Sequence, residues 1–202
     1  MHFYEPRNGH GLRHDPFNAI IAPRPIGWIS TCSEDGAPNL APYSFFNAFN
    51  YTPPLIGFSS LGEKDSVRNA RATGEFVWNL VSLSLAEAMN QSCAPVPYGV
   101  NEFVLAGLDT APSRLVRPPR VAASLVSMEC KVTQIVQLQT QTGAPLNTWL
   151  TMGEVLAVHI DDSLIEDGIY QTAKGQPVMR GGGPADYFTI DPDQLFRMTR
   201  PG

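Results

Sequence analysis

One stretch of the chain starts as a strand and then departs from strand patterning: Asn39-Leu40-Ala41-Pro42-Tyr43-Ser44-Phe45-Phe46-Asn47. A strand places successive side chains on opposite faces, yet Phe45 and Phe46 are adjacent here, with Ser44 and Asn47 on either side. This broken alternation predicts a bend that re-aims side chains and backbone amides. Such a bend suits a flat ring with polar edges, because it offers aromatic groups for the faces and amides and hydroxyls for the rim.

A hairpin precedes the bend and places two hydroxyl side chains beside it. Residues 27–32 have the strand-favouring sequence GWISTC, an Asp-Gly turn follows, and residues 39–44 return antiparallel. In this arrangement Ser30 and Thr31 lie next to the bend. Because a proline donates no backbone hydrogen bond, Pro42 predicts that the second strand lies at a sheet edge or contains a bulge.

A strand-to-helix junction follows at residues 55–72. A short apolar strand leads into a helix that ends at Gly74, with Asp65 or Ser66 as its predicted cap. Lys64 and the first-turn amides suit a phosphate, because helix N-termini favour anions. No glycine fingerprint marks the junction. Two interpretations therefore stay open for this segment alone: a phosphate site, or a solvated basic helix with an ordinary cap.

The longest strands are predicted at residues 126–138 and 146–160. Apolar residues alternate there with polar ones, and Glu129 and Lys131 occupy polar positions. The two strands are expected to pair as a long hairpin, which forms one wall of a barrel or of a two-sheet core. His159 lies on the opposite face of the apolar alternation, and we interpret it as a strand-surface histidine rather than a catalytic base.

Three irregular segments accompany these strands. Residues 1–25 form a polar N-terminal arm, residues 92–120 a long Pro-rich connection, and residues 177–202 a C-terminal tail. Loops as long as the second usually serve or cover a site. In the tail, Arg180 and Tyr187 flank three consecutive glycines, which permit close backbone approach or unusual backbone angles.

Length and composition limit the class of protein. The 202 residues contain no internal repeat and no low-complexity segment, which predicts one domain over residues 1–202. The 17 glycines and 18 prolines favour short elements joined by turns over a helix bundle. The net charge of −5 gives no electrostatic footprint for nucleic acid or for an anionic membrane. No window is long and apolar enough for a transmembrane helix.

Cysteine and histidine usage gives no metal or disulfide signal. The three cysteines are widely spaced, and no cationic segment followed by an apolar run opens the chain, so we expect reduced thiols in a cytoplasmic protein. His10 and His14 have a metal-ligand spacing only in a helix, and the glycines beside His10 disfavour one. No Ser-His-Asp or Cys-His grouping emerges.

Together these segments resemble the flavin reductase-like family with the FMN-binding split barrel, in its flavoredoxin-type branch. The resemblance rests on sequence runs that occur in the family's order over nearly the whole chain. They are HDPF at residues 14–17, APRPIGWIST at 22–31, NLAPYSFFN at 39–47, PP at 53–54, KDS at 64–66 with Asn69, GEF at 74–76, and RGG at 180–182 with Tyr187.

The resemblance implies a mainly β fold, a six-stranded Greek-key split β-barrel with a few short helices. It further implies a homodimer with one FMN per subunit near the dimer interface. The implied cofactor-binding residues are Trp28, Ile29, Ser30, Thr31, Ser44, Phe45, Phe46, Asn47, Lys64, Asp65, Ser66, Asn69, Arg180, Gly181 and Tyr187.

The implied activity is hydride transfer from NAD(P)H to FMN, with the electrons passed on to oxygen, to a carrier protein or to another enzyme. In such enzymes the cofactor performs the chemistry and the protein positions it. The absence of a nucleophile or triad agrees with this, and no residue is assigned as a general acid or base. Two alternatives remain open: an FMN-bound electron-transfer protein without a nicotinamide site, and a barrel that binds haem or no cofactor.

Overall fold

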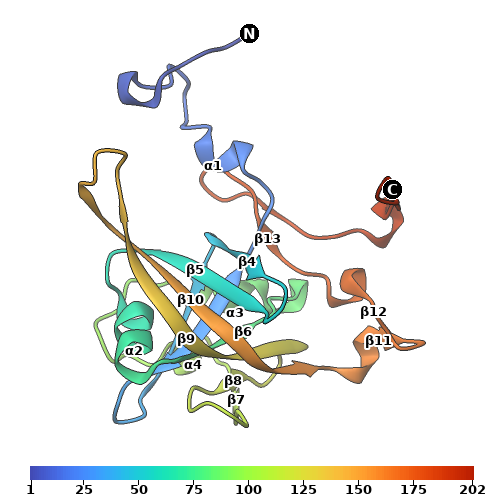
Figure 1. Ribbon diagram of the computed structural model, residues 1–202. Coiled ribbons are helices and arrows are strands. Elements are labelled where there is room, and N and C mark those ends of the chain that lie inside the picture. Colours follow the sequence, from blue (N-terminus) through green and yellow to red (C-terminus); the bar gives the residue numbers. More distant parts are fainter.

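A single antiparallel sheet of seven strands forms the body of the protein (Figure 1). The computed structural model describes all residues, 1–202. The expected mainly β split barrel is confirmed. The strands, in their order across the sheet, are β3 (Pro38–Tyr43), β2 (Gly27–Cys32), β6 (Glu75–Asn79), β9 (Val126–Gln139), β10 (Pro145–Ile160), β5 (Leu55–Leu61) and β4 (Phe46–Asn50).

The two edge strands of this sheet, β3 and β4, are consecutive in the chain. Only Ser44 and Phe45 separate them. Two residues span too short a distance to cross an open sheet of seven strands, so the sheet must curl until its edges approach. Ser59 N on β5 donates to Phe45 O at 2.8 Å and fixes the link against the sheet. The predicted bend therefore adds a seventh strand to the six expected, and Pro42 lies at a sheet edge as predicted.

The concave side of the curled sheet is filled by apolar side chains. Tyr43 and Phe58 have ring centroids 4.6 Å apart, and Phe58 meets Phe76 edge-on at 5.6 Å. These aromatic residues belong to one buried cluster with Ile29 and Cys130, so the cluster joins residues from five strands. Contacts of this kind hold the curl, because burying aromatic surface is worth several kcal/mol per ring.

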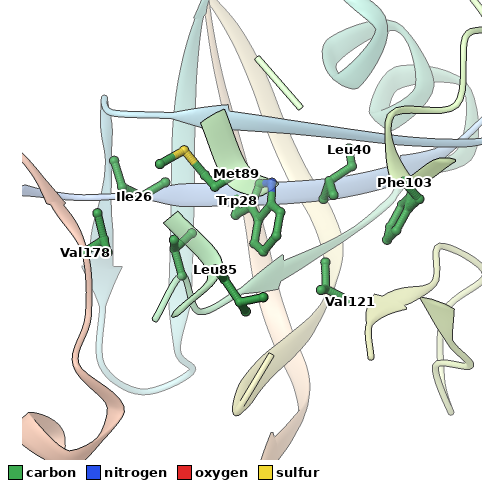
Figure 2. Packing of buried hydrophobic residues seen from close by; sticks show 9 residues of the cluster. Ile26, Trp28, Leu40, Leu85, Met89, Phe103, Val121 and Val178 are labelled. Atoms are coloured by element: carbon green, nitrogen blue, oxygen red, sulfur yellow. The ribbon is translucent and has the colours of Figure 1, made fainter. Parts of the chain in front are cut away.

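The outer face of β2 and β3 is covered by the segment after β6. Trp28 and Leu40 point from the strands toward Met89 of α3 (Ala86–Gln91) and Phe103 of α4 (Glu102–Leu105) (Figure 2). Val121 joins the same cluster from β8 (Arg120–Val121), which pairs with β7 (Thr110–Ala111). The long Pro-rich connection is thus a packed cover over the sheet.

Helix α2 ends where the sequence predicts, but the predicted cap is wrong. α1 spans Phe17–Ile20, and α2 spans Asp65–Thr73 and ends at Gly74, whose φ of 70° is the left-handed conformation that favours glycine. Neither Asp65 nor Ser66 caps α2. Lys64 occupies the N-cap position and makes no side-chain cap bond.

Small two-residue strands connect the arm and the tail. β1 (Arg24–Pro25) pairs with β13 (Met179–Arg180), which pairs with β14 (Tyr187–Phe188). A further pair is β11 (Ile165–Glu166) with β12 (Ile169–Tyr170). Figure 1 shows the first residues, the last residues and the tip of the β9–β10 hairpin extending away from the body. No helix is long and apolar enough to cross a membrane.

The predicted alternation along β9 is broken at three residues: Ser127 and Glu129 are buried at polar positions, and Val136 is 41% exposed at an apolar one. Glu129, predicted on a polar face, is fully buried and holds the Pro-rich connection in place. Its carboxylate accepts hydrogen bonds from Arg114 N at 2.8 Å and Leu115 N at 2.6 Å, and His159 Nε2 lies 2.5 Å from it. Burial raises the pKa of Glu129, but these partners outweigh burial and hold the pKa below its ordinary value.

We expect Glu129→Gln to lower the free energy of unfolding by roughly 2–3 kcal/mol at neutral pH, because glutamine turns an NH₂ group toward amide donors. Since the depressed pKa makes the contribution of Glu129 present above the unfolded carboxyl pKa and lost below it, the difference from wild type should shrink as the medium is acidified. Urea denaturation across pH measures both. Exposed Glu34→Gln is the control, and equal stability of the Glu129 variant at neutral pH would contradict the assignment.

Candidate functional site

Two cavities flank the bend between β3 and β4. The larger, here the Lys64 cavity, has a volume of about 780 Å³ and lies between β3, the start of α2 and the connection after α3. The smaller, here the Arg24 cavity, has a volume of about 440 Å³ and lies between the N-terminal arm and β4. The first is lined by Tyr43, the last residue of β3, and the second by Ser44, the first residue of the link, so the two cavities meet the chain at consecutive residues.

The Lys64 cavity brings together the residues that were predicted to bind a phosphate. Lys64, Asp65 and Ser66 line it together. Lys64 is exposed and forms no ion pair, whereas Arg68 pairs with Asp65 at 3.7 Å and stacks on the ring of Tyr98 at 4.7 Å. Because no side chain caps α2, the cavity offers a free cation beside the uncapped first-turn amides of a nine-residue helix.

A buried polar network fixes the start of α2 against the sheet. Asn39 Nδ2 donates to Thr31 Oγ1 and to Ser66 Oγ, each at 3.0 Å, and Asn69 Nδ2 donates to Thr31 Oγ1 at 3.2 Å. All four residues are buried. Thr31 and Asn69 therefore lie beneath the Lys64 cavity and orient its wall, while Ser66 belongs to both the network and the lining.

The Arg24 cavity brings together the predicted residues of the bend. Ser44, Phe45, Phe46 and Asn47 all line it. Arg24 braces the bend from the arm: its Nε donates to Ser44 O at 3.2 Å, and its guanidinium lies 5.7 Å from the ring centroid of Phe45. Phe46 turns back and stacks on Trp78 at 5.7 Å, so only one of the two adjacent phenyl rings is left at the surface.

Positive charge gathers behind the bend. Arg24 is buried, and its Nη1 also donates to Ile21 O at 2.7 Å. Burial and the neighbouring charge of Arg180 lower the pKa of Arg24. Arg180 lies opposite Arg24 in the β1–β13 pair. Two adjacent cations favour negative charge on a group bound at the bend.

Three predicted residues of β2 have no surface at which to meet a ligand. Trp28, Ile29 and Ser30 are fully buried. Trp28 Nε1 donates to Ser92 Oγ at 2.9 Å, and Ser30 Oγ donates to Pro119 O at 2.5 Å. Their part in cofactor binding stays a prediction. In this structure Trp28 and Ser30 anchor the cover over the outer face of the sheet, while Ile29 packs in the cluster on the concave side.

The predicted tail residues form a separate unit. The Arg180 guanidinium donates to the carbonyls of Gly182 and Asp186, each at 2.8 Å, and Tyr187 lies over it with its ring centroid 5.0 Å away. A side chain at Gly182 would overlap Ala19 of α1, so glycine lets the tail pack against the arm. Arg180, Gly181 and Tyr187 line neither the Arg24 nor the Lys64 cavity, and their cofactor contacts stay a prediction.

Two residues of the Lys64 cavity were not predicted. Tyr43 has a buried hydroxyl without a hydrogen-bond partner. Burial raises its pKa to about 12, and although Ser66 and Ser60 lie near, neither meets the geometry of a hydrogen bond. Glu102 is buried and accepts from Leu40 N at 3.0 Å. Sequence reasoning missed both residues, because a tyrosine within a strand and an acidic residue in a long connection carry no motif of their own.

Comparison with known proteins places this geometry in a family. Residues 21–178 match the family described as Flavin reductase like domain. The chain belongs to the flavin reductase-like family. It is 36% identical over 170 residues to an uncharacterized protein of Aquifex aeolicus, covering 81% of this chain and 83% of that protein. It is 37% identical over 169 residues to an uncharacterized protein of Halalkalibacterium halodurans, covering 81% and 80%.

Solved structures of similar shape include component B of nitrilotriacetate monooxygenase from Bacillus cereus. That structure has a TM-score of 0.86 and 29% identity, and 98% of each chain is covered. The flavoredoxin of Desulfovibrio vulgaris has a TM-score of 0.77 with 20% identity, covering 93% of this chain and 97% of that one, which supports the fold alone. Family membership supports flavin binding and a flavin-linked oxidoreductase activity for this protein.

Proposed function

We propose that the protein binds FMN across the bend and transfers hydride from NAD(P)H to it. The phosphate lies in the Lys64 cavity, and the ring edge meets the backbone and side chains of Ser44–Asn47. One observation carries the proposal: an unpaired lysine at an uncapped helix N-terminus lines a large cavity that extends to Tyr43, the residue before the bend. The family membership established above supplies the cofactor class.

The phosphate end is supported by charge and by backbone geometry together. Lys64 has no partner to lose on binding a phosphate, so its charge-assisted hydrogen bond comes at no cost to another ion pair. The first-turn amides of α2 lie at the positive end of the helix dipole, and both favour an anion at this terminus. The network of Asn39, Thr31 and Asn69 keeps this terminus in place before the ligand arrives.

The ring end is supported by the bend and by the charge behind it. Ser44 provides a hydroxyl, Asn47 is exposed, and Phe45 gives an aromatic surface at the cavity. Arg24 lies behind the link, with Arg180 opposite it in the β1–β13 pair, and positive charge there stabilises negative charge on the bound group.

FMN, when bound, supplies the hydride-accepting and electron-donating chemistry. The chain binds and orients it, and no side chain is assigned a proton-transfer role. Electrons then pass to a small molecule or to a protein acceptor. The similarity to a solved monooxygenase component agrees with a protein acceptor.

Lys64→Ala should weaken FMN binding about tenfold to 150-fold, because losing a hydrogen bond to a charged group costs roughly 1.5–3 kcal/mol. Riboflavin, which has no phosphate, should bind the variant and the wild type alike. Fluorescence titration measures both affinities. Lys174→Ala, which removes an exposed lysine paired with Glu166, is the matched control. Unchanged FMN affinity in the Lys64 variant would remove the phosphate site from this cavity.

Anaerobic titration tests the hydride step directly. We expect the FMN-loaded protein to lose its visible flavin absorbance when NADH or NADPH is added, and to regain it when air is admitted. Protein-free FMN under the same conditions is the control. If neither nicotinamide bleaches the bound cofactor while dithionite does, the protein is an electron-transfer flavoprotein without a nicotinamide site.

We also propose that the protein is a homodimer. Its accessible surface is 12,377 Å², whereas a compact monomer of 22.0 kDa is expected to expose about 9,300 Å². Large apolar residues are exposed on the arm, on the hairpin and on the tail: Phe3, Leu12, Phe17, Val136, Leu156, Val158, Leu195, Phe196 and Met198. Extended apolar segments of this kind are typical of chains that wrap around a second copy.

Light scattering after size exclusion should give twice the monomer mass of 22.0 kDa, and the mass should not fall on dilution to micromolar protein. Removing the apolar tail residues by the triple change Leu195→Ser, Phe196→Ser, Met198→Ser should weaken the dimer, since all three are exposed in the single chain. A monomer mass for the wild type would contradict the proposal.

A further inference from the structure

The Lys64 cavity contains a buried acid that the phosphate site does not use. Glu102 is the first residue of α4, lines the cavity, and is only 6% exposed. Its Oε2 accepts from Leu40 N at 3.0 Å, and Leu40 is the only other residue that donates to it. This bond attaches α4 to the edge strand β3 and explains why the side chain is held inward.

The surroundings of Glu102 do not provide an ion-pair partner. Burial raises the pKa of Glu102, and the charge of Asp65 adds to the shift, while Leu40 N partly opposes it. Lys64 and Arg68 line the same cavity, but neither lies within ion-pair distance of Glu102. The titratable groups that line the cavity with it are Glu63, Lys64, Asp65 and Arg68 from the α2 junction, Cys93 and Tyr98 from the following connection, and Tyr43 from β3.

A second polar residue lines this cavity. Tyr43 is 8% exposed, and its buried hydroxyl meets no hydrogen-bond geometry with a neighbour. The lining of the cavity thus combines a lysine without an ion pair, a strand tyrosine and a buried carboxyl.

We propose that Glu102 couples the binding of a phosphate-bearing flavin to the uptake of one proton. A dianionic phosphate beside Lys64 and an ionised Glu102 repel each other within one cavity of about 780 Å³. When the phosphate enters, a proton from solvent binds to the Glu102 carboxylate, the repulsion ends, and the neutral acid is able to donate a hydrogen bond. Glu102 therefore sets how tightly the flavin is held as pH changes. This inference rests on the proposed function.

Glu102→Gln separates this role from the structural one. The amide oxygen of glutamine still accepts from Leu40 N, so the attachment of α4 is retained, while the charge is removed. Because the raised pKa means that the ionised form is disfavoured in the folded protein, the variant is expected to be no less stable than wild type at neutral pH. Glu87→Gln, the same change at an exposed residue outside the cavity, is the matched control.

Binding of FMN and riboflavin is measured by fluorescence in phosphate-free buffer, from mildly acidic to mildly alkaline pH. At the alkaline end Glu102→Gln should bind FMN about fivefold more tightly than wild type, and the difference should vanish at the acidic end. Riboflavin and the Glu87 control should show no difference. The inference is overturned if wild type and Glu102→Gln share one FMN pH profile, or if riboflavin shows the same difference.

Calorimetry gives a second test that counts protons directly. In two buffers of different ionisation enthalpy, wild type should take up more protons on binding FMN than Glu102→Gln does, because the phosphate of FMN contributes the same exchange in both proteins. Equal proton exchange in the two proteins overturns the coupling. Wild-type protein that binds neither flavin overturns the proposed function and this inference with it. FMN binding with the same proton exchange in both proteins overturns the inference alone.

Discussion

The fold depends on one geometric constraint: two residues, Ser44 and Phe45, join the opposite edges of a seven-stranded sheet. The sheet has to curl for so short a link to be possible, and the rings of Phe58 and Phe76 fill the space that the curl encloses. The same constraint exposes the backbone of the link. Arg24 Nε donates to the carbonyl of Ser44, and Ser59 N donates to the carbonyl of Phe45. Ser44 and Phe45 also line the Arg24 cavity.

The closure of the sheet brings together elements that are distant in sequence, and the candidate site lies where they meet. The start of α2 lies beneath β3 through the bonds of Asn39 to Thr31 and Ser66. The phosphate end and the ring end of the proposed cofactor site are therefore fixed by the same strand. Glu102 completes the wall from a third segment, which connects the site to the cover on the outer face.

Local patterns predicted the strands well, since alternation and the Asp-Gly turn report on neighbours in sequence. β2, β3 and the hairpin of β9 and β10 lie where expected. Predictions that needed tertiary contacts were weaker. Glu129 on β9 is buried because amides of a distant loop surround it, and Trp28 reaches Ser92 rather than a cavity. Lys64 lines a cavity at the junction where a phosphate site was predicted, but the cap of α2 was misplaced, because a side-chain cap is only one way to satisfy first-turn amides.

The central claim is that one ligand spans the bend, with its phosphate at Lys64 and its ring edge at Ser44–Asn47. A crystal structure of the protein with bound FMN tests this most directly. We expect a phosphate oxygen within hydrogen-bond distance of Lys64 Nζ and the α2 amides, and ring-edge atoms within the same distance of the Ser44–Asn47 backbone. A phosphate bound elsewhere, or a ring with no contact to the bend, would contradict it.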